Sequence, residues 1–160
     1  MSTSRGEDLA LALRMADAAD AITLARYQAQ DLTITTKPDN TPVTDADKAT
    51  EKRIREILTS ERPQDLVVGE EFGSPSETSG RYYWVIDPID GTKNFVRGVP
   101  TWATLIALVN PAHEVVVGVV SAPALFRRWH ATHGEGAYVS VNGATPRAIR
   151  VSDIARLEDA

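Results

Sequence analysis

Two aspartates stand three residues apart in WVIDPIDGTKNF, residues 84–95, directly after an apolar run with the character of a β-strand. Glu70 follows an earlier apolar run, LVVG at residues 66–69. Because strand ends in one sheet can lie side by side, we expect the carboxylates of Glu70, Asp87 and Asp90 to converge. Unpaired carboxylates at short range repel and resist ionisation, and a hard divalent cation such as Mg²⁺ removes that conflict. The pattern therefore predicts a metal site.

The residues around the aspartates predict a phosphate site beside the metal. Pro88 fixes its own φ and restricts Asp87 to an extended conformation. The carbonyl of Ile89, between the two aspartates, is a further candidate ligand. Gly91 and Thr92 stand at an expected helix start, where backbone N–H groups bind phosphate. Adjacent metal and phosphate sites are the arrangement that metal-assisted hydrolysis of a phosphate ester needs.

The same aspartates have a structural alternative, which is a tight turn between strand and helix with the acids capping N–H groups. The Gly-Thr pair, Glu70 and the acids of TDAD, residues 44–47, favour a site over this turn. Three other motifs are excluded by counting. An EF-hand loop and the D-x-D of aspartyl-nucleophile phosphatases need acids at alternate positions, and the chain has no G-x-x-x-x-G-K-[ST] phosphate loop.

Asp47 and Thr92 form a second candidate pair. A threonine hydroxyl beside a carboxylate can orient a water molecule as a nucleophile. Asp47 also stands three residues after Thr44, the spacing of a capping box at a helix start. The two roles are compatible, since helix N-termini often face functional sites, and both remain open here.

The elements that must position these residues follow from periodicity and turn chemistry. Residues 7–30 carry apolar side chains at three- and four-residue steps without Pro or Gly, which predicts an amphipathic helix. A second helix is expected over residues 45–61, ended by Pro63. Residues 37–43 are expected as a loop, and Asn142-Gly143 as a hairpin turn. The expected strands are residues 32–36, 66–69, 81–87, 103–109, 114–123, successive strands within 127–141, and 148–151.

This order predicts an α+β fold, a largely antiparallel sheet packed on two helices within a single domain over residues 1–160. A net charge of −5 disfavours nonspecific nucleic-acid binding, and no apolar run approaches the ~18 residues of a membrane span. The absence of cysteine excludes disulfides and thiolate metal sites. MSTSRGEDLA has no apolar segment of a secretory signal, so a cytoplasmic location is expected.

Three segments resemble signatures of the magnesium-dependent inositol monophosphatase family: PVTDADKATE at residues 42–51, GEE at 69–71, and WVIDPIDGTKNF at 84–95. Essentially the whole chain is similar to the N-terminal portion of that family. Residues 96–109 and 119–138 are most similar to the histidinol-phosphatases of this superfamily found in actinobacteria. The resemblance implies the layered α/β sandwich of the inositol monophosphatase and fructose-1,6-bisphosphatase type, usually dimeric.

The resemblance also implies roles for the candidate residues. It implies about two or three Mg²⁺ ions in a complete site, which Mn²⁺ can replace. The implied metal ligands are Glu70, Asp87, Asp90 and the Ile89 carbonyl. Glu70 and the Asp47–Thr92 pair would activate water. The implied contacts to the substrate come from Glu70, Ile89, Asp90, Gly91 and Thr92, the last two through backbone N–H groups.

The implied activity is hydrolysis of a small phosphate ester, with L-histidinol phosphate in histidine biosynthesis expected first. Inositol monophosphate or a related sugar or nucleotide phosphate is the alternative. One departure stands out: Trp84, Trp102 and Trp129 are followed by Val, Ala and His, so the Trp-Asp motif of the family's second half is absent. We therefore expect the first half of such an enzyme. A catalytically incomplete metal- and phosphate-binding domain that acts by association is the alternative of another class.

Overall fold

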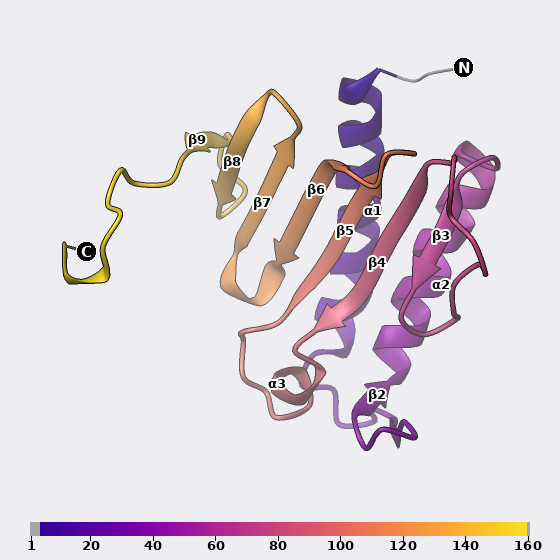
Figure 1. Ribbon diagram of the computed structural model, residues 1–160. Coiled ribbons are helices and arrows are strands. Elements are labelled where there is room, and N and C mark those ends of the chain that lie inside the picture. The colour runs from indigo at the N-terminus through magenta and orange to yellow at the C-terminus, as the bar shows by residue number, and fades with distance from the viewer. Residues whose placement is uncertain (1–3, 160) are drawn as a thin grey trace.

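The computed structural model describes residues 4–159 as one seven-stranded sheet with two long helices on one face (Figure 1). The strands follow the order β3-β4-β5-β6-β7-β8-β9, and β1 and β2 form a separate hairpin. The helices are α1 (Arg5–Arg26), α2 (Asp45–Glu61) and α3 (Thr92–Val96). The strands are β1 (Ile34–Thr36), β2 (Pro42–Thr44), β3 (Leu66–Gly69), β4 (Tyr83–Asp90), β5 (Ala103–Val109), β6 (Val115–Ala122), β7 (Arg127–Thr132), β8 (Gly136–Val141) and β9 (Arg147–Ile149). Among these described residues, no helix combines the length and apolar character that crossing a bilayer requires.

The first helix ends earlier than its periodicity predicts. It begins at a capping box, in which the Ser4 and Glu7 side chains each accept a backbone N–H of the other. Its predicted end at residue 30 is wrong, because the backbone turns extended at Tyr27. The Tyr27 ring packs against Phe95 and Trp102, and its hydroxyl donates to the Gly98 carbonyl at 2.6 Å. This tertiary contact outweighs the helical propensity of the last four predicted residues.

The second helix begins and ends where the sequence predicts, at Asp45 and Glu61, with Thr44 and Asp47 as its capping box. In the segment before α2, both the first strand and the loop that follows it are shorter than the sequence predicts. Only Ile34–Thr36 of the expected strand 32–36 pairs, and its partner Pro42–Thr44 includes two residues of the expected loop 37–43. The chain therefore enters α2 from a short antiparallel hairpin.

The sheet is antiparallel throughout except at β3 and β4, which pair in parallel with Gly69 opposite Ile86. Residues 70–82 connect these two strands. In parallel neighbours both strands run toward the same edge of the sheet, so Glu70, directly after β3, comes to lie beside Asp87 of β4. This pairing supplies the convergence that the sequence predicts for these two acids.

The sequence prediction that the strand ends at Asp87, before the rest of the DPID segment, is wrong. The strand continues to Asp90 through a β-bulge, because Asp87 pairs with Leu105 and Asp90 with Ala103. One extra residue in β4 therefore opposes β5. The buried Thr104 hydroxyl donates to the Pro88 carbonyl at 2.8 Å and fixes the bulge across the two strands.

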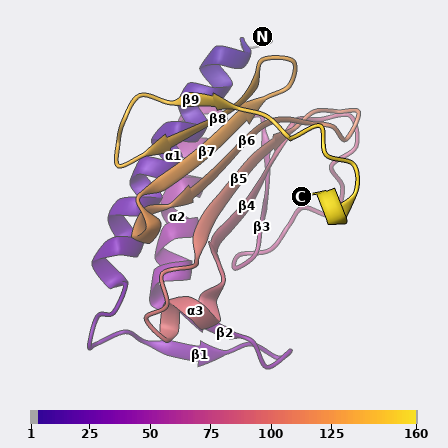
Figure 2. The ribbon, with the colours of Figure 1, turned by 90° about the vertical axis from the view of Figure 1, so that its left-hand side faces the viewer.

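The main core lies between the sheet and the two long helices, which Figure 2 shows on the same side of the sheet. It is formed by buried side chains of β4, β5, β6, α1 and α2, among them Trp84, Ile86, Ile106, Leu108, Val117, Val119, Leu11, Met15, Ile54 and Leu58. The predicted segment 127–141 is two strands, β7 and β8. Asn142 and Gly143 both have positive φ, which is the conformation of the predicted turn. The predicted α+β architecture is confirmed.

Candidate active site

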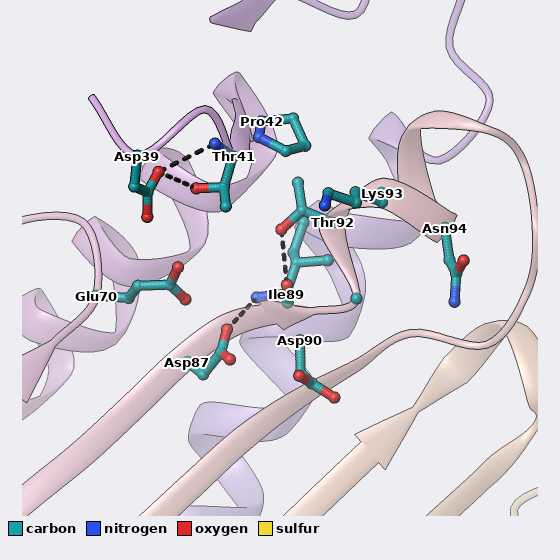
Figure 3. Close-up of a pocket in the computed structure, with 11 residues that line it drawn as sticks. Asp39, Thr41, Pro42, Glu70, Asp87, Ile89, Asp90, Thr92, Lys93 and Asn94 are labelled. Carbon is teal, nitrogen blue, oxygen red and sulfur yellow. Dashed lines mark hydrogen bonds between the residues drawn. The ribbon is translucent and has the colours of Figure 1, made fainter. Parts of the chain in front are cut away.

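A cavity of about 330 Å³ lies where the ends of β3 and β4, the start of α3 and the β1–β2 hairpin meet (Figure 3). Every residue that the sequence nominates, except Asp47, lines this cavity: Glu70, Asp87, Ile89, Asp90, Gly91 and Thr92. Asp39, Thr41, Pro42, Lys93 and Asn94 complete the lining. Segments from four parts of the chain therefore build one acidic hollow.

Glu70 and Asp87 are in electrostatic conflict. Burial, followed by the charge and hydrogen bond of Glu70 and the charge of Asp90, raises the pKa of Asp87 from 3.8 to about 7. The Ile89 N–H donates to Asp87 Oδ1 at 3.1 Å and opposes this rise without cancelling it. Near neutral pH the pair therefore holds a proton that a cation could displace.

Asp90 lies differently from the other two acids. Its carboxylate is exposed and points away from Glu70 and Asp87 in Figure 3, although it lines the same cavity. Within residues 4–159, accordingly, no group of at least three acidic, histidine or cysteine side chains is already arranged to hold a metal ion. The structure brings Glu70 and Asp87 together and leaves Asp90 turned outward.

The donor set nevertheless fits a hard divalent cation. It consists of carboxylate oxygens and the Ile89 carbonyl, which the bulge of β4 places at the cavity. Burial and the carboxylates of Glu70 and Asp90 raise the pKa of Asp87, and a cation held by these oxygens would relieve the repulsion among them. Glu70, Asp87, Asp90 and Ile89 therefore remain the predicted ligands.

Asp47 and Thr92 meet as predicted, although they belong to different elements. Thr92 Oγ1 lies 3.2 Å from Asp47 Oδ1 and 2.9 Å from the Ile89 carbonyl oxygen. The other oxygen of Asp47 accepts from the Thr44 N–H at 2.8 Å and the Thr44 hydroxyl at 2.6 Å. Asp47 thus fills the capping role and contacts Thr92, and its part in orienting a water molecule stays a prediction. Burial raises its pKa against the hydrogen bonds from Thr44 and Thr92, which favours proton uptake.

Thr92 can also receive a water molecule. Its single hydroxyl proton can be donated to only one of its two acceptors at a time, and its oxygen lone pairs remain available to accept. Beside it, Gly91 caps α3 in the left-handed conformation, at φ 87°, which favours glycine. The N–H groups in the first turn of a helix have no partner within the helix. The phosphate site at Gly91 and Thr92 stays a prediction.

Lys37 is the main residue at this site that the sequence did not reveal. Its ammonium donates to Glu70 at 2.6 Å and to Glu71 at 2.7 Å, from the turn of the β1–β2 hairpin. Burial lowers the pKa of Lys37, and the hydrogen bonds and charges of the two glutamates outweigh this and raise it. The contact spans more than thirty positions, within a segment that reads only as a loop, so no local pattern could indicate it.

The sequence model of the inositol monophosphatase family matches residues 6–159. The chain belongs to the inositol monophosphatase family. The resemblance predicted from its three signatures is therefore confirmed. Among curated relatives, the histidinol-phosphatase of Mycobacterium tuberculosis is 57% identical over 154 residues, which cover 96% of this chain and 58% of that protein. The histidinol-phosphatase of Streptomyces coelicolor is 53% identical, with 96% and 58% covered.

Solved structures of this family share the fold. The extragenic suppressor protein suhB of Bartonella henselae superposes with a TM-score of 0.83 at 29% identity, covering 94% of this chain and 57% of that one. An IMPase of Thermotoga maritima gives a TM-score of 0.82 at 31% identity, with 95% and 56% covered. The chain therefore spans somewhat less than 60% of the length of the relatives it matches.

Proposed function

We propose that this chain is the N-terminal metal- and phosphate-binding domain of a Mg²⁺-dependent phosphomonoesterase whose substrate is L-histidinol phosphate. One observation carries the proposal: the Asp47–Thr92 pair adjoins the acidic hollow of Glu70 and Asp87, in a chain of this family. The substrate rests on 57% identity to a histidinol-phosphatase. The homodimer, the cytoplasmic location and the place in histidine biosynthesis belong to the same proposal.

The chain's own residues suggest how water would be activated. A water molecule that donates to Thr92 Oγ1 can pass a proton on as the Thr92 hydroxyl proton moves to Asp47, whose pKa burial raises. The water oxygen then bonds to phosphorus, the ester P–O bond breaks, and the leaving alkoxide takes a proton from solvent. The N–H groups of Gly91 and Thr92 would hold the phosphate in place. Bound Mg²⁺ ligated by Glu70, Asp87, Asp90 and Ile89 would stabilise the negative charge of the transition state.

A second candidate is a metal- and phosphate-binding domain that is inactive alone and acts by association with another chain. It is favoured by the outward orientation of the Asp90 carboxylate. The family's other activities, on inositol, sugar or nucleotide phosphates, remain alternatives for the substrate.

Phosphate release from histidinol phosphate, inositol monophosphate, fructose 1,6-bisphosphate and 3′-phosphoadenosine 5′-phosphate tests these candidates together. The assay compares this chain with a chimera that adds the remaining segment of the M. tuberculosis relative. We expect Mg²⁺-dependent turnover that prefers histidinol phosphate and is lost in Asp90→Asn, with Asp153→Asn, at an exposed distant aspartate, as the control. Turnover that survives in Asp90→Asn contradicts the mechanism. Activity confined to the chimera supports the second candidate.

A further inference from the structure

Glu51 is a charged residue that the proposed chemistry leaves unused. It lies on α2 and is fully buried, with 0% of its surface exposed. It follows Asp47 by four residues, so both side chains leave the same face of the helix. A buried carboxylate is costly unless hydrogen bonds compensate it, so its partners indicate what it does.

Those partners are the backbone that carries Glu70. Oε2 of Glu51 accepts from the Glu71 N–H at 2.6 Å, and Oε1 accepts from the Phe72 N–H at 3.2 Å. The guanidinium of Arg55, one turn further along α2, donates to Oε1 at 2.8 Å and to the Gly73 carbonyl at 2.6 Å. Helix α2 thus binds the chain just after β3 through charge-assisted hydrogen bonds, which are stronger than hydrogen bonds between neutral groups.

Gly69 shows how closely the two segments approach. A Cβ at this position would lie 1.9 Å from Oε1 of Glu51, so no side chain fits there without moving the carboxylate. The chain therefore leaves β3 in direct contact with Glu51. The same loop is also held by Lys37, which binds the carboxylates of Glu70 and Glu71.

Helix α2 consequently supports both halves of the cavity from one face. Asp47 contacts Thr92 at the start of α3, just after β4, and Glu51 contacts the residues directly after Glu70, just after β3. Glu70 directly precedes Glu71 and Phe72, so holding the N–H groups of these two residues constrains the backbone next to the Glu70 side chain. Figure 3 shows the Glu70 carboxylate directed into the cavity beside Asp87.

We infer that Glu51 is a positioning residue, whose buried carboxylate holds the backbone after β3 so that Glu70 faces Asp87 across the cavity. This inference rests on the proposed function in so far as the cavity is a metal site. Residues outside the ligand set that orient the ligands typically change metal affinity or activity by about 10–100-fold when they are altered. Glu51 would act on the site without touching metal or substrate.

The test compares Glu51→Gln with Glu56→Gln, which removes the same charge from an exposed position on the same helix. In Glu51→Gln an amide NH₂ replaces an acceptor and faces N–H donors. We expect hydrogen exchange of the Glu71 and Phe72 amides to accelerate at least about tenfold, with near-native helix content by circular dichroism. Titration with MnCl₂ alone should show about 10–100-fold weaker binding in Glu51→Gln. Glu56→Gln should match the unsubstituted protein in both measurements.

The two measurements separate this inference from the proposed function. Unchanged exchange at Glu71 and Phe72 overturns the inference, as does unchanged Mn²⁺ affinity when exchange has accelerated. If the unsubstituted protein binds no Mn²⁺, the proposed metal site fails, and the exchange result still decides whether Glu51 holds the loop. Should Glu51→Gln fail to fold, Arg55→Met is the second variant, at a partly exposed position. It removes the hydrogen bonds of Arg55 to Glu51 and to the Gly73 carbonyl, and it must accelerate hydrogen exchange of the Glu71 and Phe72 amides.

Discussion

Asp87→Asn is expected to stabilise the metal-free protein while it removes metal binding. The pKa of Asp87 rises from 3.8 to about 7 on folding, because burial and Glu70 disfavour its charged form. The folded state therefore binds more protons than the unfolded state between these values, and stability falls as pH rises from 4 to 7. Asparagine keeps an acceptor for the Ile89 N–H and carries no charge.

The magnitude follows from the same shift. Unscreened, it corresponds to about 4 kcal/mol, and solvent around the partly exposed carboxylate reduces this to about 1–2 kcal/mol. For a protein of this size, that predicts a melting temperature about 3–6 °C higher in Asp87→Asn at pH 8 in EDTA. The difference should shrink as the pH falls towards 4 and vanish below the unfolded pKa of 3.8, where both states hold the proton.

Thermal melts from pH 4 to pH 8, with EDTA or with MgCl₂, provide the assay. Mg²⁺ should stabilise the unsubstituted protein, because a ligand that binds only the folded state raises its melting temperature, and should leave Asp87→Asn unchanged. Asp153→Asn, at an exposed position, controls for the loss of one charge. If Asp87→Asn melts below the unsubstituted protein at pH 8 in EDTA, the conflict between Glu70 and Asp87 has been misjudged.

Two further substitutions address the water-activating pair and the contact at the end of β3. Thr92→Val in the chimera removes the hydroxyl that faces Asp47 and should lower kcat by about 10²–10⁴-fold. Thr92→Ser keeps a hydroxyl and should retain most of the activity. Equal losses of kcat in the two variants would contradict a role for the hydroxyl. Gly69→Ala should lower the melting temperature by several degrees, about 2–4 °C for each kcal/mol of strain, because the new methyl group overlaps a buried carboxylate. Gly118→Ala, with open space at its Cβ, is the matched control, and an equal effect of the two alanines would show that overlap is not the cause.

Local signals in the sequence predicted most elements and the nominated residues. The capping box at Thr44 and Asp47 fixed the start of α2, and the apolar runs before Glu70 and Asp87 located β3 and β4. The convergence of the Glu70 and Asp87 carboxylates could be predicted because the ends of neighbouring strands often lie at the same edge of a sheet. The three signatures then identified the family, which the match over residues 6–159 confirms.

The misplaced or missed features all depend on contacts between distant segments. The end of α1 is set by the packing of Tyr27 on Phe95 and Trp102. The bulge of β4 is set by its pairing with β5. Lys37 and Glu51 both bind residues 70–72 after β3, far from them in the chain, and in the sequence both residues look like ordinary surface charges. The periodicity of apolar residues and the residue types of turns carry no information about contacts between segments that are distant in the chain.

The parallel pairing of β3 with β4 also bears on how the chain can vary. Glu70 and Asp87 are aligned by the register of Gly69 opposite Ile86, and the residues between them do not set their spacing. Residues 74–80 of the connection are largely exposed, beyond the Gly73 carbonyl that Arg55 holds. Added residues in an exposed loop raise its closure entropy only slowly. This segment can therefore lengthen, shorten or accept an inserted reporter peptide while the two acids keep their places, which makes it a natural point for length variation in proteins built on this sheet.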